Sequence, residues 1–263
     1  MTLPFIDLER YPIDQPQSPA YQTLLDQCHA GLDRIGAAVL DRFLLPDPIK
    51  QATQEVAPHL SKAFYKTKSH SPYLIADDPD LAPEHPRNRK QMTNSATLGY
   101  DLIPQDSLLN QLYLTSAFQD FLADVLGFDK LYPYADNLTP LNILVYQPGN
   151  ELGWHFDVST FVVTLALQAC DKGGEFLYAP FIRSDEDENY GAVDQVLSGS
   201  FPDLKVLRQD PGCLVIFRGS RTLHRVTRVE GERDRLMAVF SYTPKPGTYS
   251  DPHNLKTFYG RTS

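Results

Sequence analysis

The sequence predicts a mainly β protein, built as a two-sheet jelly roll with helices in its N-terminal part. Three observations lead to this fold class. Short β-branched or aromatic runs follow one another from Leu131 onward, turn residues separate them, and helical spacing is confined to the first half. Regularly spaced short strands are typical of two packed antiparallel sheets. The expected strands cover residues 141–146, 161–167, 175–178, 213–217, 223–229 and 236–242.

The N-terminal half carries helix signals. Ser18 followed by Pro19 is typical of a helix start, and apolar residues then recur at helical spacing as far as Ile35. The other elements expected before residue 131 are helices over 46–65 and 116–126, a buried strand over 37–40, and irregular loops over the proline-rich and charged residues 66–100.

We expect a single domain, because β-rich barrels of 263 residues commonly form one. Residues 1–130 would give helical and loop support, residues 131–243 the jelly-roll core, and residues 244–263 a C-terminal tail.

The composition of the chain argues against several classes of protein. The formal net charge is -9 and the sequence pI is about 5.2, which argues against a nucleic acid substrate because phosphate neutralisation needs clustered Lys and Arg. No apolar run approaches the length of a membrane span, and the first residues lack the blocks of a signal peptide, so we expect a cytoplasmic protein. The three cysteines show no metal-binding spacing and indicate no disulfide framework.

His155, Asp157 and His224 are the candidate metal ligands and catalytic centre. A His-x-Asp pair joined by a distant histidine matches the two-histidine, one-carboxylate facial triad, which leaves iron positions open for chemistry. Sixty-six residues separate Asp157 from His224, and ten residues then separate His224 from Arg235. A lone His-x-Asp pair is a weak signal, because exposed loops produce such pairs by chance. Here apolar strands flank the pair, and the later residues come in the expected order.

In this pattern, the chain resembles the iron(II) and 2-oxoglutarate dependent dioxygenases. The resemblance covers residues 131–243 well and the first 130 residues only through Phe5-Ile6-Asp7-Leu8, which is similar to the first strand of many relatives. It implies a double-stranded β-helix fold with N-terminal helices. It also implies that iron(II), O2 and the co-substrate 2-oxoglutarate are used, and that Arg235 binds the distal carboxylate of 2-oxoglutarate.

Arg235 also has a physical reason to meet an acid. It begins the apolar run 236–240, so its guanidinium would point into the barrel, where an unpaired cation is costly. A dicarboxylic acid supplies a bidentate partner. Arg228 and Arg233 lie nearer the turn at Gly231 and are expected to be solvated. A structural salt bridge is the alternative role for Arg235.

Tyr146 and Asn142 complete the predicted co-substrate pocket. Four residues are two strand repeats, so both side chains share one face of the expected strand. In related sequences a tyrosine about nine residues before the first ligand contacts 2-oxoglutarate, and the resemblance implies this role for Tyr146 and, by its shared face, for Asn142. Some relatives have a serine two positions after the arginine, where this chain has Met237.

Asp157 also bears on the type of reaction. Relatives that halogenate have a small residue at this position, which leaves room for chloride, whereas this chain has the carboxylate. The resemblance therefore implies hydroxylation of an unactivated C–H bond. Desaturation, ring closure and oxidative dealkylation use the same ligands and stay open.

The substrate is less well defined by the sequence. We expect a small polar molecule, a free amino acid or a natural-product intermediate, because the compact chain resembles bacterial family members that act on such compounds. The candidate substrate residues are Trp154 beside the first ligand, Arg87 and Arg89 in the expected loops, and Arg183 in a lid segment spanning 181–190. Ordinary solvated charge is the alternative for these arginines.

Two other classes remain open at this stage. A hydroxylase of protein side chains, as in the prolyl hydroxylases, would use the same iron site but needs an open groove for a peptide. A non-catalytic metal-binding β-barrel would keep the three ligands but needs neither Arg235 nor oxygen. Nothing in the sequence indicates the oligomeric state.

Overall fold

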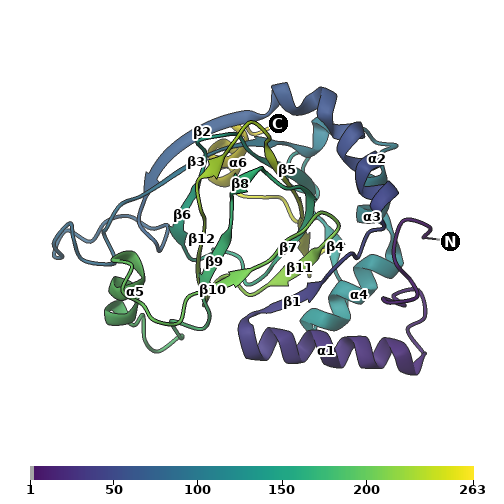
Figure 1. Cartoon of the computed structure of the whole chain (residues 1–263), viewed down its shortest axis with the longest axis horizontal. Coiled ribbons are helices and arrows are strands. Elements are labelled where there is room, and N and C mark those ends of the chain that lie inside the picture. Colours follow the sequence, from purple (N-terminus) through teal and green to yellow (C-terminus); the bar gives the residue numbers. More distant parts are fainter. Residues whose placement is uncertain (1–2) are drawn as a thin grey trace.

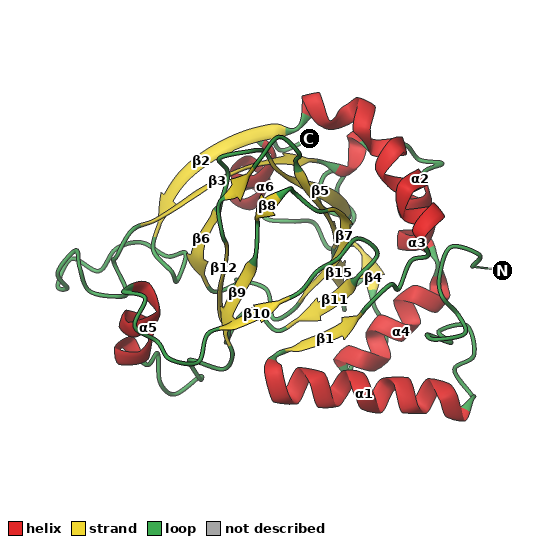
Figure 2. Cartoon of the chain, in the orientation of Figure 1, coloured by secondary structure: helices red, strands yellow, loops and turns green. Residues whose placement is uncertain are grey.

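The structure is a computed structural model, and it describes residues 3–263. Its centre is a β-barrel-like pair of antiparallel sheets, seen nearly end-on in Figure 1, with helices α1 to α4 gathered along one side. Helix α5 and the loop that precedes β3 lie on the other side of the sheets (Figures 1 and 2). The predicted fold class, a jelly roll with N-terminal helices, is confirmed.

The larger sheet has seven strands in the order β1-β11-β7-β14-β5-β3-β2, and every neighbouring pair is antiparallel. In that order the strands are Ala37–Leu40, Leu214–Phe217, Val162–Gln168, Arg235–Phe240, Leu141–Tyr146, Gln91–Leu98 and Phe64–His70.

The smaller sheet faces the larger one and has the order β10-β9-β12-β6. Its strands are Lys205–Leu207, Phe176–Ala179, Leu223–Val226 and Leu152–His155. Two short ribbons pair β13 (Val229–Glu230) with β8 (Lys172–Gly173) and β15 (Tyr242–Thr243) with β4 (Tyr132–Pro133).

The main hydrophobic core lies between the larger sheet and the N-terminal helices. These helices are α1 (Pro19–Ile35), α2 (Pro46–Val56), α3 (Leu108–Leu114) and α4 (Ser116–Leu126). Helix α1 starts as predicted: the Ser18 hydroxyl accepts a hydrogen bond from the Tyr21 N–H, and Pro19 occupies the first turn. The core joins residues from both halves of the chain, because Phe118 of α4 packs edge-on against Phe240 of β14.

Strand alternation gives the larger sheet two different faces. On β5, Leu141, Ile143 and Val145 pack into the core shared with the helices. Leu144 and Tyr146 instead pack against residues of the smaller sheet. The even-numbered residues of β5 therefore point into the space between the two sheets, which we call the barrel interior.

Several predicted elements are wrong. Residues 66–100 were expected to be irregular loops, but they hold most of β2 and all of β3, which extend the larger sheet. Their inward-facing residues are polar, so the sequence lacks the apolar alternation that marks a half-buried strand. The helix from Pro46 ends at Val56 and continues only as the 3-10 turn η1 (Ala57–Lys62), because Pro58 cannot donate the next helical hydrogen bond.

Three helices were missed. They are α3, α5 (Tyr190–Leu197) and α6 (Pro252–Tyr259), the last of which lies in the expected C-terminal tail. Ser107, Asn189 and Asp251 cap their N-termini with side-chain oxygens, so a search for capping residues could have found all three. A short 3-10 turn, η2 (Tyr100–Leu102), completes the elements. Among residues 3–263, no helix has the length and apolar character that crossing a bilayer requires.

We predict that Phe118→Ala lowers the free energy of unfolding by about 3–5 kcal/mol, because a fully buried ring between helix and sheet is replaced by a cavity. Leu114→Ala on α3 is the control. Leu114 is 53% exposed, so its truncation should change stability by less than about 0.5 kcal/mol. Equilibrium denaturation of both variants tests this, and equal losses would contradict the assigned core.

Candidate metal centre and co-substrate pocket

The two candidate histidine ligands meet across a strand pair. β6 and β12 are antiparallel neighbours, and their register places His155 directly opposite His224. Directly opposed residues share a face of the sheet, so both imidazoles project into the barrel interior with ring centroids 4.2 Å apart. The ring of Phe176 stacks on His224 and that of Phe217 meets it edge-on, which restricts its rotation.

Backbone carbonyls orient both imidazoles. Nδ1 of His155 lies 2.9 Å from the carbonyl oxygen of Gly153, and Nδ1 of His224 lies 2.9 Å from that of Thr222. A carbonyl oxygen can only accept, so each Nδ1 carries the hydrogen and each Nε2 is left with a free lone pair. This is the arrangement that metal-binding histidines adopt.

Asp157 brings its carboxylate to the same point. Its Oδ1 is 3.5 Å from Nε2 of His155 and 3.5 Å from Nε2 of His224, and one ligand atom from each of the three residues lies within 4.8 Å of the others. The carboxylate fits because residue 219 is glycine: a Cβ there would lie 1.7 Å from Oδ2 of Asp157. The Asp157 N–H also donates to the carbonyl of Gly219.

The charges of these groups suit a cation. Burial alone would raise the pKa of the Asp157 carboxyl, but the neighbouring imidazoles of His224 and His155 outweigh burial and hold that pKa well below its usual range. Burial and the nearby His224 lower the pKa of His155. The site therefore offers one carboxylate and two imidazole nitrogens, a donor set that fits divalent iron.

Arg235 lies in the barrel interior beside Tyr146. It is 7% exposed, its register partner across β14 and β5 is Tyr146, and its guanidinium carbon is 5.5 Å from the Tyr146 ring centroid. One nitrogen donates to Oε1 of Gln209 at 2.6 Å, but no carboxylate within residues 3–263 pairs with it. Burial lowers the pKa of Arg235 and raises that of Tyr146 to about 12. The guanidinium is thus a buried cation for which residues 3–263 supply no anion, an arrangement that is costly in a folded protein.

Glycine at position 174 also makes room for this arginine. Gly174 has a φ of +63°, and a Cβ there would lie 2.6 Å from Sγ of Cys170 and 3.0 Å from Cδ of Arg235. Arg233, which the sequence left as a competitor, is exposed and pairs with Asp171.

Asn142 does not join this pocket. It shares the inner face of β5 with Tyr146, as expected, but its amide donates to the hydroxyl of Tyr259 at 3.3 Å. Tyr259 belongs to α6, so the structure places Asn142 against the C-terminal helix, whereas Tyr146 lies beside Arg235.

The structure places Trp154 away from the metal ligands, contrary to its predicted place in the pocket wall. Trp154 precedes His155 on β6, so strand alternation points it to the opposite face. There it packs in a separate hydrophobic cluster with α5, and the Arg225 guanidinium lies over its ring.

The candidate substrate arginines are engaged within the protein. Arg87 donates to the carbonyl of Ala76 and pairs with Asp78, whereas Arg89 bonds the carbonyl of Glu84 and pairs with Asp194 of α5. These contacts hold the segment before β3 to α5, so neither guanidinium is free to clamp a substrate.

Arg183 stands closer to the candidate centre. Its guanidinium carbon is 4.0 Å from the ring centroid of Phe156, the residue between the two ligands, and its Nε donates to the carbonyl of Ser220. It also pairs with Glu188 at 3.0 Å. Arg183 therefore ties the expected lid segment to the loop that holds Asp157.

Sequence reasoning missed four residues that the structure brings to this region. They are Gln209 beside Arg235, Gly219 under Asp157, and His70 and Thr93 beside His155. His70 and Thr93 both lie in the segment 66–100, which was expected to form irregular loops. No spacing rule connects any of the four to the ligands, because only the folded sheets bring them near.

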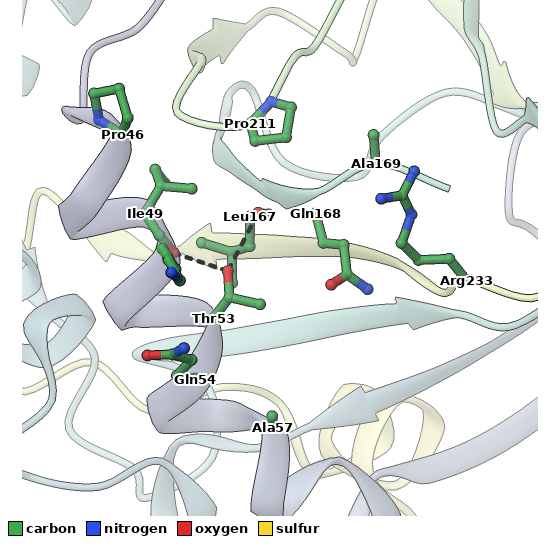
Figure 3. A pocket seen from close by; sticks show the side chains of 11 residues that line it. Pro46, Ile49, Thr53, Gln54, Ala57, Leu167, Gln168, Ala169, Pro211 and Arg233 are labelled. Carbon is green, nitrogen blue, oxygen red and sulfur yellow. Dashed lines mark hydrogen bonds between the residues drawn. The ribbon is translucent and has the colours of Figure 1, made fainter. Parts of the chain in front are cut away.

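A separate groove lies on the outer side of the larger sheet, between α2 and β7 (Figure 3). Thr53 of α2 connects its two sides, because its hydroxyl lies 2.9 Å from the carbonyl oxygen of Ile49 and 3.3 Å from the carbonyl oxygen of Leu167 on β7. None of the three candidate ligands lines this groove.

Comparison with known proteins gives a family. A family model described as Halogenase D matches residues 23–254, and no curated protein matches the chain. Many solved structures resemble the fold. A 2OG-Fe(II) oxygenase family oxidoreductase from Burkholderia pseudomallei has 14% identity and a TM-score of 0.51, with 85% of this chain and 92% of that chain covered.

Two further structures are similar in fold. HygX from Streptomyces hygroscopicus, solved with nickel, 2-oxoglutarate and hygromycin B, has 16% identity and a TM-score of 0.54, with 86% of this chain and 89% of that chain covered. The non-heme alpha ketoglutarate dependent epimerase SnoN from nogalamycin biosynthesis has 12% identity and a TM-score of 0.54, with coverage of 88% and 93%. Together with the family match and the site geometry, these findings place the protein: it belongs to the Halogenase D family, within the iron(II) and 2-oxoglutarate dependent oxygenases.

Proposed function

We propose that the protein hydroxylates an unactivated C–H bond of a small polar molecule, either a free amino acid or a natural-product intermediate. Substrate, 2-oxoglutarate and O2 would give hydroxylated substrate, succinate and carbon dioxide, with one oxygen atom in the new hydroxyl and the other in succinate. His155, Asp157 and His224 would hold the iron(II), and Arg235 with Tyr146 would hold the distal carboxylate of 2-oxoglutarate.

One observation carries this proposal: a complete two-histidine, one-carboxylate cluster shares the barrel interior with a buried arginine that has no acidic partner among residues 3–263. Bound iron(II) supplies the oxidation chemistry. The chain supplies placement. The carbonyls of Gly153 and Thr222 fix the two imidazoles, Gly219 leaves room for the carboxylate, and Arg235 gives an anionic co-substrate one orientation.

The family's name raises halogenation as the other reaction, and Asp157 argues against it. A halide ligand needs the position that a carboxylate otherwise fills, and here Oδ1 of Asp157 lies 3.5 Å from each Nε2. The lowered pKa of Asp157 keeps it anionic, which would also repel chloride. Hydroxylation therefore fits this donor set better. Desaturation, ring closure and dealkylation would use the same residues.

A small substrate is supported by the contacts that cover the smaller sheet. The segment before β3 is tied to α5 by Arg89 and Asp194, and Tyr73 donates to the carbonyl of Glu188 in the lid segment. A prolyl-type hydroxylase would need an open channel for a peptide where these segments join. HygX, which was solved with hygromycin B, is a similar fold with a small-molecule ligand.

A non-catalytic metal-binding barrel is the remaining alternative. It would explain the three ligands but would give no reason to bury the guanidinium of Arg235 without an acid, an arrangement that destabilises the folded protein on its own. The unpaired arginine favours an enzyme that binds an anionic co-substrate.

We predict that the purified protein releases succinate from 2-oxoglutarate when iron(II) and air are present, and that a chelator stops the release. In chloride-free buffer, Asp157→Ala should reduce succinate release to background, because only two ligands remain and no halide can take the place of the carboxylate. Asp171→Ala, which removes an exposed carboxylate paired with Arg233, is the control and should retain the rate. Succinate quantified by chromatography tests this. A fully active Asp157→Ala variant would overturn the assigned iron site.

We predict that Arg235→Ala raises the KM for 2-oxoglutarate about ten- to a hundredfold, as expected for the loss of charged hydrogen bonds worth ~1.5–3 kcal/mol. The rate at saturating 2-oxoglutarate should change less. Arg233→Ala removes an exposed guanidinium two residues away and should leave this KM unaltered. An unchanged KM in the Arg235 variant would move the anchor elsewhere.

A further inference from the structure

Lys66 on the edge strand β2 carries a second cation without an acidic partner. No carboxylate within residues 3–263 pairs with its ammonium, which lies 4.0 Å from the ring centroid of Phe258 on α6. Burial, with a smaller contribution from Lys68, lowers the pKa of Lys66 to about 7. Lys66 is half-buried, and no anion within residues 3–263 compensates for the water that its ammonium loses.

The register of β2 and β3 places Lys66 on the inner face of the sheet. Phe64 pairs with Thr97 and Lys66 with Ser95, so these four side chains share one face. Ala96 and Leu98, on the other face of β3, belong to the core shared with the helices. Lys66, Ser95 and Thr97 therefore face the barrel interior.

Thr97 is an independent sign of a missing partner. Its side chain is 2% exposed, and its hydroxyl has no hydrogen-bond partner within the described chain. A buried hydroxyl without a partner is unfavourable and uncommon. Thr97 is the diagonal neighbour of Lys66 across the two strands, so the ammonium and the unpartnered hydroxyl belong to the same face of the sheet.

This pair lies in the same interior as the candidate iron site. β3 also carries Thr93, whose hydroxyl accepts from the N–H of Gly153, two residues before His155. Ser95 and Thr97 continue the inner face of β3 from that point, and α6 packs over it through the Asn142 and Tyr259 contact and through Phe258. The pair is thus separate from Arg235, which lies on β14 with β5 and β3 between it and Lys66.

We propose that Lys66 and Thr97 form the subsite that binds a carboxylate of the substrate. This inference rests on the proposed function and narrows its substrate class to carboxylic acids, free amino acids first among them. Because Arg235 would be occupied by 2-oxoglutarate, a second carboxylate needs its own cation, and the Thr97 hydroxyl would donate to the same group. No covalent step is involved.

The test compares acids with their amides. Wild-type protein with iron(II) and 2-oxoglutarate is assayed for succinate release with each free L-amino acid and with the corresponding amino acid amide, which keeps the side chain but loses the negative charge. We expect at least one acid to stimulate release, and its amide to require at least about ten times the concentration, as for one lost charged contact.

Variants then assign the effect to residues. Lys66→Met should raise the KM for the stimulating acid at least about tenfold and remove the preference over the amide, whereas Lys66→Arg should keep the preference. Thr97→Val removes the hydroxyl but nearly keeps the shape of the side chain, and it should raise the same KM. Lys130→Met is the control, because Lys130 makes a comparable contact with Tyr132 but is exposed. Calorimetry also measures the affinity of the acid for nickel-loaded protein under nitrogen. This affinity does not depend on turnover.

The outcomes separate this subsite from the proposed function. Equal stimulation by acids and amides, stimulation by neither, or an unchanged KM in both Lys66→Met and Thr97→Val would overturn the subsite. In those cases, succinate release by the wild-type protein without added substrate would still support the oxygenase. Absence of any succinate release from the wild type would instead overturn the proposed function.

Thr93 is also the centre of a chain of hydrogen bonds that ends on His155. Nδ1 of His70 lies 2.9 Å from the carbonyl of Ser71, so Nε2 of His70 accepts from the Thr93 hydroxyl at 2.8 Å. The Thr93 oxygen accepts from the Gly153 N–H at 2.9 Å, and the carbonyl of Gly153 accepts from Nδ1 of His155.

We infer that Thr93 and His70 are positioning residues for His155, acting through Gly153. Thr93→Val keeps the shape but can neither donate to His70 nor accept from Gly153, so His155 loses its fixed orientation. In metal-free protein, Thr93→Val should weaken cobalt(II) binding about tenfold or more and alter the visible spectrum of the bound ion. Thr93→Ser should restore both.

Thr67→Val, on the exposed face of β2, is the matched control and should bind cobalt(II) as the wild type does. Melting temperatures of all variants show whether the fold is retained. Wild-type cobalt(II) affinity and spectrum in a folded Thr93→Val variant would overturn the positioning role.

Discussion

The pairing of β6 with β12 is the constraint on which the site depends. It sets His155 opposite His224 although 68 positions separate them in the chain, and it turns both imidazoles into the same interior. Asp157 follows where β6 has ended, and its carboxylate reaches the two imidazoles because Gly219 has no side chain. A register shift of one residue between these two strands would turn one of the two imidazoles to the outer face and dismantle the cluster.

The basic side chains of the barrel interior share one property: both lack an acidic partner in the described chain. The chain has a formal net charge of -9, yet the interior holds two basic side chains, Arg235 and Lys66, that no acid of the described chain neutralises. An unpaired cation destabilises a folded protein when it loses water, fully at buried Arg235 and in part at half-buried Lys66. Two anionic ligands would complete the interior, one a dicarboxylate co-substrate beside Arg235 and the other a carboxylate substrate beside Lys66. An anionic ligand would remove the destabilisation that the unpaired cations cause, so the protein would bind acids in preference to neutral compounds.

The Halogenase D family match and the carboxylate at position 157 have to be considered together. Membership in a family describes ancestry and fold, whereas the reaction depends on which ligands surround the iron. Asp157 is ionised and held between two imidazoles, and Gly219 gives it the space it needs. The local chemistry therefore supports the proposed hydroxylation over halogenation, and the family match accounts for the fold.

The sequence alone determined the parts of this protein that leave a local or ordered signature. Residue types in a fixed order indicated His155, Asp157, His224 and Arg235, and apolar runs with turn residues indicated most strands of the jelly roll. The predicted substrate residues pack elsewhere: Trp154 adjoins His155 in the sequence but lies on the opposite face of its strand, and Arg87 and Arg89 are engaged by neighbouring segments. The tertiary structure alone decided that β2 and β3 extend the larger sheet and that Asn142 meets α6. The physical reason is that a strand whose inner face is polar has no apolar period to detect, and contacts between distant segments are fixed only when the sheets close.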